Sequence, residues 1–331
     1  MNPFFDIKPK ADMRPAAPPS KHGIAAELIA VLVAVTGSEP RVLTIQGRRA
    51  LPSGPFELAH RSLQSGLRAW VERQTRLPLG YVEQLYTFAD RDRAGATAQH
   101  VISISYLGLT REQPASGEHE ASWHSWYDYF PWEDHRLGAP PLVEKKLRPG
   151  LASWVSATPD RAVQRSRRQR AAMLFGFENH VWNEELVLQR YELLYEAGLI
   201  PEAVRSKSPT PASDSAALSA TPGKSMILDH RRILATGIAR LRAKIKYHPV
   251  VFELMPDTFT LLQLQRCVEA LAGKLVHKPN FRRLIEQQEL VEETGETSQD
   301  TGGRPAKLFR FRRTVFAERA ITGTKLPISG A

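Results

Sequence analysis

The sequence predicts an α+β chain built in two parts. In the first part, apolar strand-like runs flank a segment whose apolar residues recur at helical spacing. The strand-like runs are residues 23–35, 41–46, 81–88 and 101–109, and the helical segment is residues 59–76. In the second part, residues 246–313 combine two helical segments with a strand hairpin. Strand runs flanking a helix are typical of an α+β sandwich.

The length of the chain supports more than one domain, because 331 residues exceed the usual ~100–200 residues of a single domain. We expect a Pro-rich arm, a sandwich unit, a connecting helix, a C-terminal domain and a tail. In order, these are residues 1–21, 22–224, 225–245, 246–320 and 321–331. The connecting helix has an apolar side that suits a dimer contact.

Residues 246–313 carry the local signals of two helices with defined ends. Thr260 and Gln263 form a T-x-x-Q capping box, so a helix is predicted to begin at Leu261 and to end before Gly273. Pro279 suits the first turn of a second helix. The apolar stripe of that second helix is Phe281, Leu284 and Ile285.

A strand hairpin with a basic tip is predicted after the second helix. Residues 292–303 are polar and contain glycine, and the strand that follows alternates Phe309 and Phe311 inward with Arg310 and Arg312 outward. Two helices followed by such a hairpin indicate a winged helix-turn-helix, a fold that binds nucleic acid.

Charge and residue type favour double-stranded DNA as the partner. The net charge is +10, and residues 226–331 hold 18 Lys and Arg against 11 Asp and Glu. Arg suits guanine edges and phosphates, and Asn suits adenine edges. The alternatives are a solvated helix face and a merely soluble basic protein. The candidate DNA-binding residues are Thr260, Lys278, Asn280, Arg282, Arg283, Arg304 and Lys307.

Residues 111–224 form an insertion rich in tryptophan and arginine. Five of the six tryptophans lie between residues 123 and 182, a density typical of a packed core or an interface. Residues 161–170 form a basic helical run that either contacts phosphate or is a solvated face. Residues 182–199 are expected to form an amphipathic helix, and residues 205–223 a linker.

No catalytic or metal site is predicted from cysteine and histidine. Cys267 is the only cysteine, and the histidines of the insertion lack metal-ligand spacing. The apolar run 24–36 contains Glu27 and is too short to cross a bilayer, so we interpret it as a buried strand. These features, with no visible targeting segment, favour a cytoplasmic protein.

Two segments resemble one known family in the right order. YVEQLYTFADRDR from Tyr81 and VISISYLGL from Val101 resemble the Nudix domain of the bacterial Nudix-related transcriptional regulators, the NrtR family. FTLLQLQ from Phe259, NFRR from Asn280 and GRPAKLFRF from Gly303 are similar to the DNA-binding domain of that family. The resemblance covers residues 22–110 and 226–313. It implies a Nudix-like α/β/α sandwich followed by a winged helix.

Residues of the insertion resemble the NadQ branch of that family, the regulators of NAD biosynthesis. These are WYDYFPWEDHR from Trp126 and the segment from Trp182. The resemblance implies NAD-biosynthesis genes as targets. We expect a homodimeric repressor, since a palindromic operator requires two readers, with ADP-ribose, NAD or ATP as the effector and no cofactor. Tyr86, Phe88, Asp90 and Arg93 are the candidate nucleotide-binding residues, with ordinary strand and loop packing as the alternative.

The Nudix box of this chain departs from the pattern of a working enzyme, G-x5-E-x7-R-E-U-x-E-E-x-G-U, whose glutamates hold divalent ions. Gly54, Arg68 and Glu72 match that pattern, with Glu72 and Arg68 interpreted as a surface pair. His60, Ala69, Arg73 and Thr75 replace the first glutamate, the second, the fourth and the last glycine. We therefore predict that the chain is not a hydrolase. The alternatives are a pyrophosphohydrolase acting on ADP-ribose or NADH, and an interaction module built on the insertion.

Overall fold

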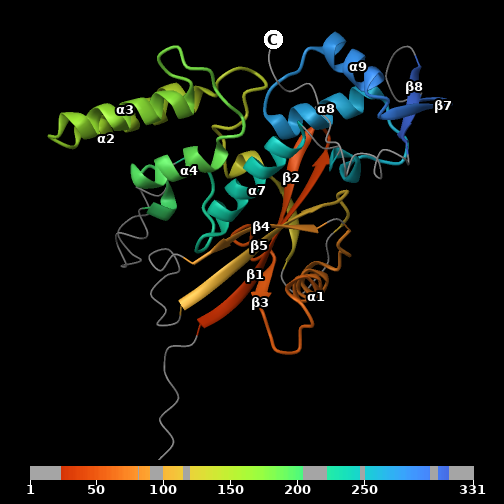
Figure 1. The fold of residues 1–331 in the computed structure, drawn as a ribbon, viewed down its shortest axis with the longest axis horizontal. Coiled ribbons are helices and arrows are strands. Elements are labelled where there is room, and N and C mark those ends of the chain that lie inside the picture. Colours follow the sequence, from red (N-terminus) through yellow and green to blue (C-terminus); the bar gives the residue numbers. More distant parts are fainter. Residues whose placement is uncertain are drawn as a thin grey trace, which may run out of the picture.

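A six-stranded mixed sheet lies at the centre of the protein (Figure 1). The computed structural model describes residues 24–80, 82–89, 100–114, 120–203, 222–246, 250–298 and 305–312. The strands are β1 (Ile24–Thr36), β2 (Glu39–Thr44), β3 (Ser53–Pro55), β4 (Val82–Phe88), β5 (His100–Leu109) and β6 (Ser122–Ser125). Their order is β4-β5-β1-β2-β6, with β3 beside β1. β1 runs parallel to β5 and antiparallel to β2 and β3, which confirms the α+β class and the predicted strand segments.

Strand β1 is buried on both faces. Its successive side chains point to opposite sides of the sheet, and each side is covered by a helix. On one face, Leu28 lies in a cluster with Leu67 of α1 (Leu63–Thr75). On the other face, Val31 packs against Gly237 of α7 (His230–Lys244). A side chain added to Gly237 would place its Cβ 2.9 Å from Val31, so the helix approaches the sheet closely. One helix on each face produces the three-layer sandwich visible in Figure 1.

Helix α1 begins later than the predicted segment 59–76. Ser62 is its N-cap and forms a reciprocal capping box with Ser65. The preceding residues form a turn instead, in which the Glu57 amide donates to His60 Nδ1 at 3.0 Å. The helix ends at Arg76, whose φ of 59° lies in the left-handed region.

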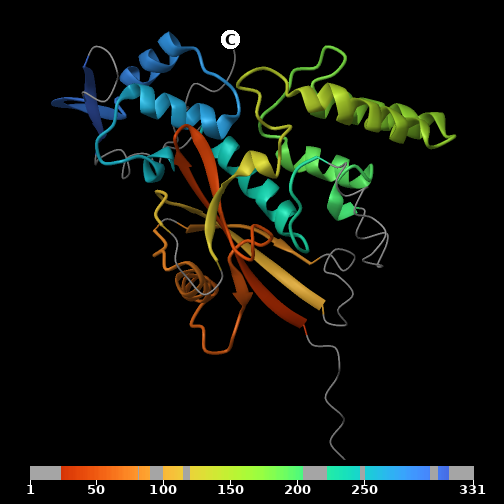
Figure 2. The same cartoon turned by 180° about the vertical axis from the view of Figure 1, so that it is seen from behind.

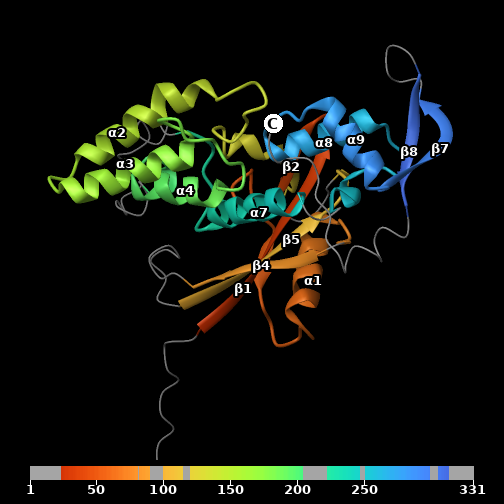
Figure 3. The same cartoon turned by 45° about the horizontal axis from the view of Figure 1, so that its top comes forward.

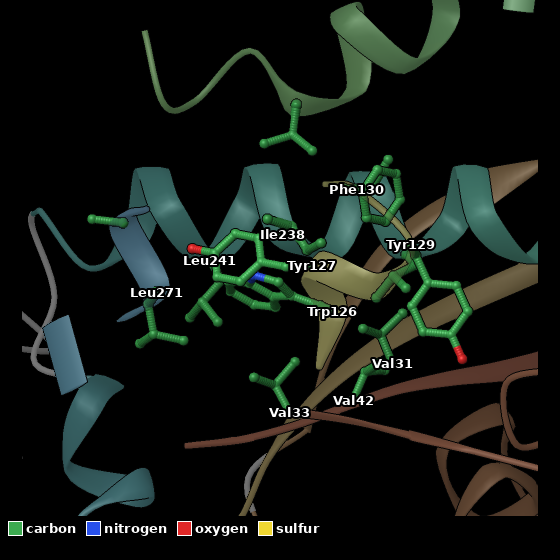
Figure 4. Packing of buried hydrophobic residues seen from close by; sticks show 14 of the residues in the cluster. Val31, Val33, Val42, Trp126, Tyr127, Tyr129, Phe130, Ile238, Leu241 and Leu271 are labelled. Atoms are coloured by element: carbon green, nitrogen blue, oxygen red, sulfur yellow. The ribbon is translucent and has the colours of Figure 1, made fainter. Parts of the chain in front are cut away.

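The insertion supplies most of the remaining helices. These are η2 (Trp126–Asp128), η3 (Val143–Leu147), α2 (Arg148–Ser156), α3 (Arg161–Phe175) and α4 (Val187–Glu196). α2 and α3 form a helical hairpin that projects from the body of the protein (Figures 1 and 3). Trp126 and Trp132 are fully buried, so the tryptophan-rich segment belongs to the core at these positions. Figure 4 shows Trp126 between Val33 of the sheet and Leu241 of α7.

Helix α7 differs from the predicted connecting helix in two respects. It begins at His230 rather than near Ser225, because Leu228 takes a φ of 44° and the amide of Met226 donates to the Glu202 carboxylate. Its apolar side is covered by the sheet and by α4, so within one chain this helix has no free apolar face for a dimer contact. Of its fifteen residues, Arg240 alone is exposed.

The C-terminal elements form two helices and a hairpin. They are η4 (Val250–Leu254), α8 (Leu261–Ala272), α9 (Lys278–Gln287), β7 (Val291–Ser298) and β8 (Ala306–Phe311). Two backbone hydrogen bonds join Phe259 to Phe309, so the hairpin is tied to the start of α8. Figure 2 shows these elements and the α2–α3 hairpin at the same end of the sheet. Among the described residues, no helix is long and apolar enough to cross a bilayer.

Candidate nucleic-acid interface

The first helix of the winged helix is fixed by its ends. The Thr260 hydroxyl accepts the amide of Gln263 at 3.2 Å, and the Gln263 side chain accepts the amide of Thr260 at 2.7 Å. Gly273 ends the helix with a φ of 71°. The capping box and the stop at Gly273 are therefore confirmed, and the buried stripe of α8 sets the position of the following helix.

The exposed side of α9 holds most of the residues expected to meet DNA. Phe281 and Ile285 are buried against the rest of the domain. Lys278, Asn280, Arg282, Arg283 and Gln287 are exposed on the other side. Among the described residues, none forms an ion pair with Lys278, Arg282 or Arg283, so these cations are available to an anionic partner.

The wing contributes cations that are already paired. Lys307 bonds Glu293 at 2.8 Å, and Arg310 bonds Glu292 at 2.6 Å, both between exposed side chains of the two strands. Exposed pairs of this kind contribute only ~0–1 kcal/mol, so a phosphate competes readily for Lys307. Arg304 and the expected basic tip lie outside the described residues.

Thr260 occupies a different position from the other predicted DNA-binding residues. It is 5% exposed, and its hydroxyl and amide are engaged in the capping box. A buried hydroxyl that already accepts a hydrogen bond is poorly placed to meet a phosphate. Thr260 was predicted to contact DNA. In the structure it caps α8 and so positions that helix.

The residues at the Nudix-box positions are engaged in the packing around α1. The indole of Trp70 covers Gly54, where an added Cβ would lie 2.2 Å from the ring, and Arg73 stacks on the same indole at 3.7 Å. Arg68 donates to the carbonyls of Leu79 and Gly80 instead of pairing with Glu72, so the prediction of an Arg68–Glu72 surface pair is wrong.

The remaining positions of the box offer one exposed carboxylate. Thr75 is buried and donates to the carbonyl of Val71 at 2.7 Å, while Glu72 is exposed. Within the described part of the chain, no group of three or more His, Cys, Asp or Glu is arranged to hold a metal ion.

The predicted nucleotide-binding residues divide between surface and core. Tyr86 is 59% exposed and meets Phe88 edge to face, with ring centroids 5.0 Å apart. Phe88 is 5% exposed and is covered by the guanidinium of Arg232 at 4.9 Å. Of these two predicted residues, Tyr86 is accessible and Phe88 is buried, while Asp90 and Arg93 lie outside the described residues.

A buried ion cluster joins the insertion to the winged helix. The Glu133 carboxylate accepts hydrogen bonds from Arg190 of α4 at 2.6 and 2.8 Å and from Arg242 of α7 at 2.7 Å. All three side chains are fully buried. Arg242 also donates to the carbonyl of Leu271 in α8 at 2.9 Å. Burial raises the pKa of Glu133, but the two arginines outweigh it, so the net shift of that pKa is downward.

Two further hydrogen bonds hold the C-terminal end of α8. The Tyr127 hydroxyl donates to the carbonyl of Ala270 at 2.8 Å, and the amide of His135 donates to the carbonyl of Gly273 at 2.7 Å. Burial raises the pKa of Tyr127 to about 12, which keeps its hydroxyl protonated as a donor. A Cβ at Gly273 would lie 2.4 Å from the carbonyl of Glu133. The sequence does not reveal this junction, because the bonded residues are far apart in the chain.

Comparisons with known proteins agree with this architecture. Residues 251–311 match the family model of the NrtR DNA-binding winged helix domain. The chain is 40% identical over 86 residues to the ADPR responsive transcriptional repressor NtrR of Acinetobacter baylyi. That alignment covers 26% of this chain and 34% of the relative, about a third of the relative's length.

Two solved structures share the fold across most of the chain. The crystal structure of Shewanella oneidensis NrtR complexed with a 27mer DNA matches with a TM-score of 0.52 and 18% identity, over 88% of this chain and 95% of that chain. A MutT/nudix family protein from Enterococcus faecalis matches with a TM-score of 0.52 and 16% identity, over 89% of each chain. The predicted resemblance to the NrtR family is therefore confirmed: residues 251–311 match the winged helix domain of that family, and most of the chain shares the NrtR fold.

Proposed function

We propose that the protein is a transcriptional repressor that binds operator DNA through α9 and the wing and senses ADP-ribose through its Nudix-like part. The observation that carries the proposal is the exposed face of α9, in a domain that matches the NrtR winged helix: there Arg282 and Arg283 have no ion-pair partner among the residues that the structure describes. The name of the curated relative supports ADP-ribose over NAD and ATP as the effector.

The proposed mechanism is a shift between two arrangements of the protein. A nucleotide changes DNA affinity only if it binds the DNA-competent and DNA-incompetent arrangements with different affinity. The contacts of the insertion with the end of α8 offer a physical route, because α9 follows α8 directly. Residues 22–224 are then the sensing unit and residues 246–320 the output unit, with α7 between them.

Footprinting on the DNA upstream of the chain's own gene and its neighbours tests this proposal. We expect a protected site whose occupancy changes with ADP-ribose, with NAD and ATP as comparison nucleotides. Protection in NAD-biosynthesis operons would support that target set. The absence of any saturable protection at physiological salt would refute DNA binding and leave the interaction-module alternative.

The proposed absence of hydrolase activity rests on the substituted box. One exposed carboxylate, Glu72, does not make the multi-carboxylate site that a divalent ion requires in this fold. Incubation with ADP-ribose or NADH and a divalent ion should give no turnover. Turnover that disappears in Glu72→Gln would establish the pyrophosphohydrolase alternative.

Tyr86 is the accessible member of the proposed nucleotide site. Tyr86→Ala should weaken binding of ADP-ribose in calorimetry while leaving thermal stability nearly unchanged, since the side chain is mostly exposed. Phe88→Ala is the matched control on the same strand: it removes a buried ring and should cost roughly 3–5 kcal/mol of stability. Unchanged affinity in Tyr86→Ala would remove this residue from the site.

Two further features complete the proposal. A homodimer would place two reading helices on a palindromic operator, about one or two helical turns apart. Light scattering of the full chain tests the dimer, and a monomeric mass on operator DNA would contradict it. A cytoplasmic location follows from the proposed role in transcription.

A further inference from the structure

The α2–α3 hairpin concentrates positive charge away from the winged helix. Residues 143–175 hold eight Lys and Arg but only two acidic residues, so a tenth of the chain carries six of its ten net charges. Both acidic residues are engaged. Glu144 pairs with Arg148 at 2.8 Å, and Asp160 caps α3 by accepting the amides of Ala162 and Val163. The positive charge of this hairpin is therefore largely uncompensated.

Three arginines of α3 form a free stripe on one face. Arg161, Arg165 and Arg168 follow one another at steps of four and three, which places them on one side of a helix. All three are exposed, and within the described residues none has an ion-pair partner. The other two arginines of the run are occupied: Arg167 donates to the carbonyl of Trp154 at 2.8 Å, and Arg170 pairs with Glu196 at 2.6 Å.

The spacing of the stripe suits a nucleic-acid backbone. Arg161 and Arg168 are separated by roughly 10 Å along the helix, at 1.5 Å per residue. Duplex DNA presents about six charges over that length, one per ~1.7 Å of axis. Beside the stripe, a hollow of about 200 Å³ between α2 and α3 is flanked by Arg148 and Arg168, with Gln164 and Glu178 also lining it.

The hairpin lies at the same end of the protein as α9. Figures 1, 2 and 3 all show α2, α3 and α9 at the end of the molecule that lies away from α1. The root of the hairpin is also fixed to the output domain. Arg190 donates to the carbonyl of Leu174 in α3 at 3.0 Å and belongs to the same buried cluster as Arg242, which holds α8.

We propose that the α2–α3 hairpin is a second DNA-binding surface, which grips the phosphate backbone beyond the segment read by α9. This inference rests on the proposed DNA-binding function and extends it to a part of the chain outside the winged helix. Arg161, Arg165 and Arg168 contact phosphates and supply affinity without sequence preference, because backbone contacts carry no direct base information. The hairpin therefore lengthens the duplex that the protein requires for full affinity.

The test compares two triple variants of the full-length chain without nucleotide. The first is Arg161→Gln, Arg165→Gln and Arg168→Gln. The matched control removes the same charge from exposed residues in and next to α1, as Arg61→Gln, Arg73→Gln and Arg76→Gln. Binding is measured over a salt series on the footprinted upstream fragment and on a duplex trimmed to the shortest length that still binds.

We expect the α3 variant to lose about tenfold or more in affinity on the long fragment and to reduce the slope of log K against log salt by about 2–3, near 0.9 per lost phosphate contact. On the trimmed duplex it should bind like the unmodified protein, and the α1 control should match the unmodified protein on both. Replacing the three arginines with lysine should preserve the salt slope.

The contrary outcomes separate the two proposals. If the unmodified protein binds the fragment and the α3 variant shows the same affinity and slope, the hairpin inference is wrong while the repressor proposal stands. An equal loss on the trimmed duplex, or an equal loss in the α1 control, also overturns the inference, because the effect would not be local to the hairpin. If the unmodified protein gives no saturable binding, the proposed function fails first.

Discussion

Glu133→Gln should be among the most destabilising single substitutions in the protein. The Glu133 carboxylate is fully buried and accepts three hydrogen bonds from two fully buried arginines, at 2.6 to 2.8 Å. The amide retains one acceptor but brings an NH2 group against arginine donors and removes the negative charge. Arg190 and Arg242 would then be buried cations without a counterion.

The magnitude follows from the burial of this cluster. Removing one partner from a buried ion pair typically costs ~3–5 kcal/mol, because the remaining charge stays desolvated. A typical domain is stable by only ~5–15 kcal/mol, so the loss is a third or more of the total. Glu144→Gln is the matched control. It makes the same substitution in an exposed ion pair, in which the side chain of Glu144 is 54% exposed and that of Arg148 is 50% exposed. The loss in stability should be less than ~0.5 kcal/mol.

Urea unfolding followed by tryptophan fluorescence measures both variants. Arg242 lies over the rings of Trp126 and Trp182, at 5.9 and 5.8 Å, so the emission reports on the cluster itself. If the free energy of unfolding of Glu133→Gln lies within ~1 kcal/mol of that of Glu144→Gln, this account of the cluster is refuted.

The pH dependence provides a second test of the same reasoning. The pKa of Glu133 is lowered in the folded protein, since burial raises it but Arg190 and Arg242 lower it further. A carboxylate with a depressed folded pKa contributes stability above its unfolded pKa and loses it as the pH falls. The stability gap between the unmodified protein and Glu133→Gln should therefore be full above the ordinary value of 4.5 and narrow at lower pH. A gap that does not change with pH would show that the charge is not responsible.

Three other substitutions test the interface and its junction. Arg282→Ala should weaken operator binding by ~1–3 kcal/mol in a gel-shift titration if its contact is to a base, with Arg76→Ala unchanged. Thr260→Ala should cost ~0.5–2 kcal/mol of stability through the lost cap, while DNA affinity measured well below the melting temperature stays the same. Tyr127→Phe removes one hydroxyl bond to α8 and should change the effect of ADP-ribose on DNA affinity, whereas Tyr129→Phe, whose hydroxyl bonds outside the winged helix, should leave that effect intact.

Local signals in the sequence predicted the elements whose ends are set by neighbouring residues. The capping box of Thr260 and Gln263 and the stop at Gly273 depend on groups within a few positions, so α8 was predicted to the residue. The burial of β1 followed from its apolar run, in which Glu27 is the only charged residue. The exposed side of α9 followed from the helical spacing of Phe281 and Ile285.

Elements determined by distant contacts were not predictable in the same way. The start of α7 is displaced because Ile227 donates to the carbonyl of Arg49, a contact that no pattern near residue 225 reveals. Glu133 meets Arg190 and Arg242 across 57 and 109 residues of chain. In sequence, buried charges of this kind look like ordinary surface residues. The tryptophan density therefore predicted a core or an interface in the insertion, but the ion pairs of Glu133 could not be predicted.

The position of this cluster changes where regulation is expected to pass. The sequence placed only the connecting helix, residues 225–245, between the two units. In the structure, α7 supplies Arg242, but the insertion supplies Glu133, Tyr127 and His135 to the same end of α8. Helix α9 begins five residues after Gly273 in the chain. The insertion therefore holds the end of α8 from which the chain continues into α9. Under the proposed function, a nucleotide that displaces the insertion relative to the sheet would act on α9 even if α7 did not move.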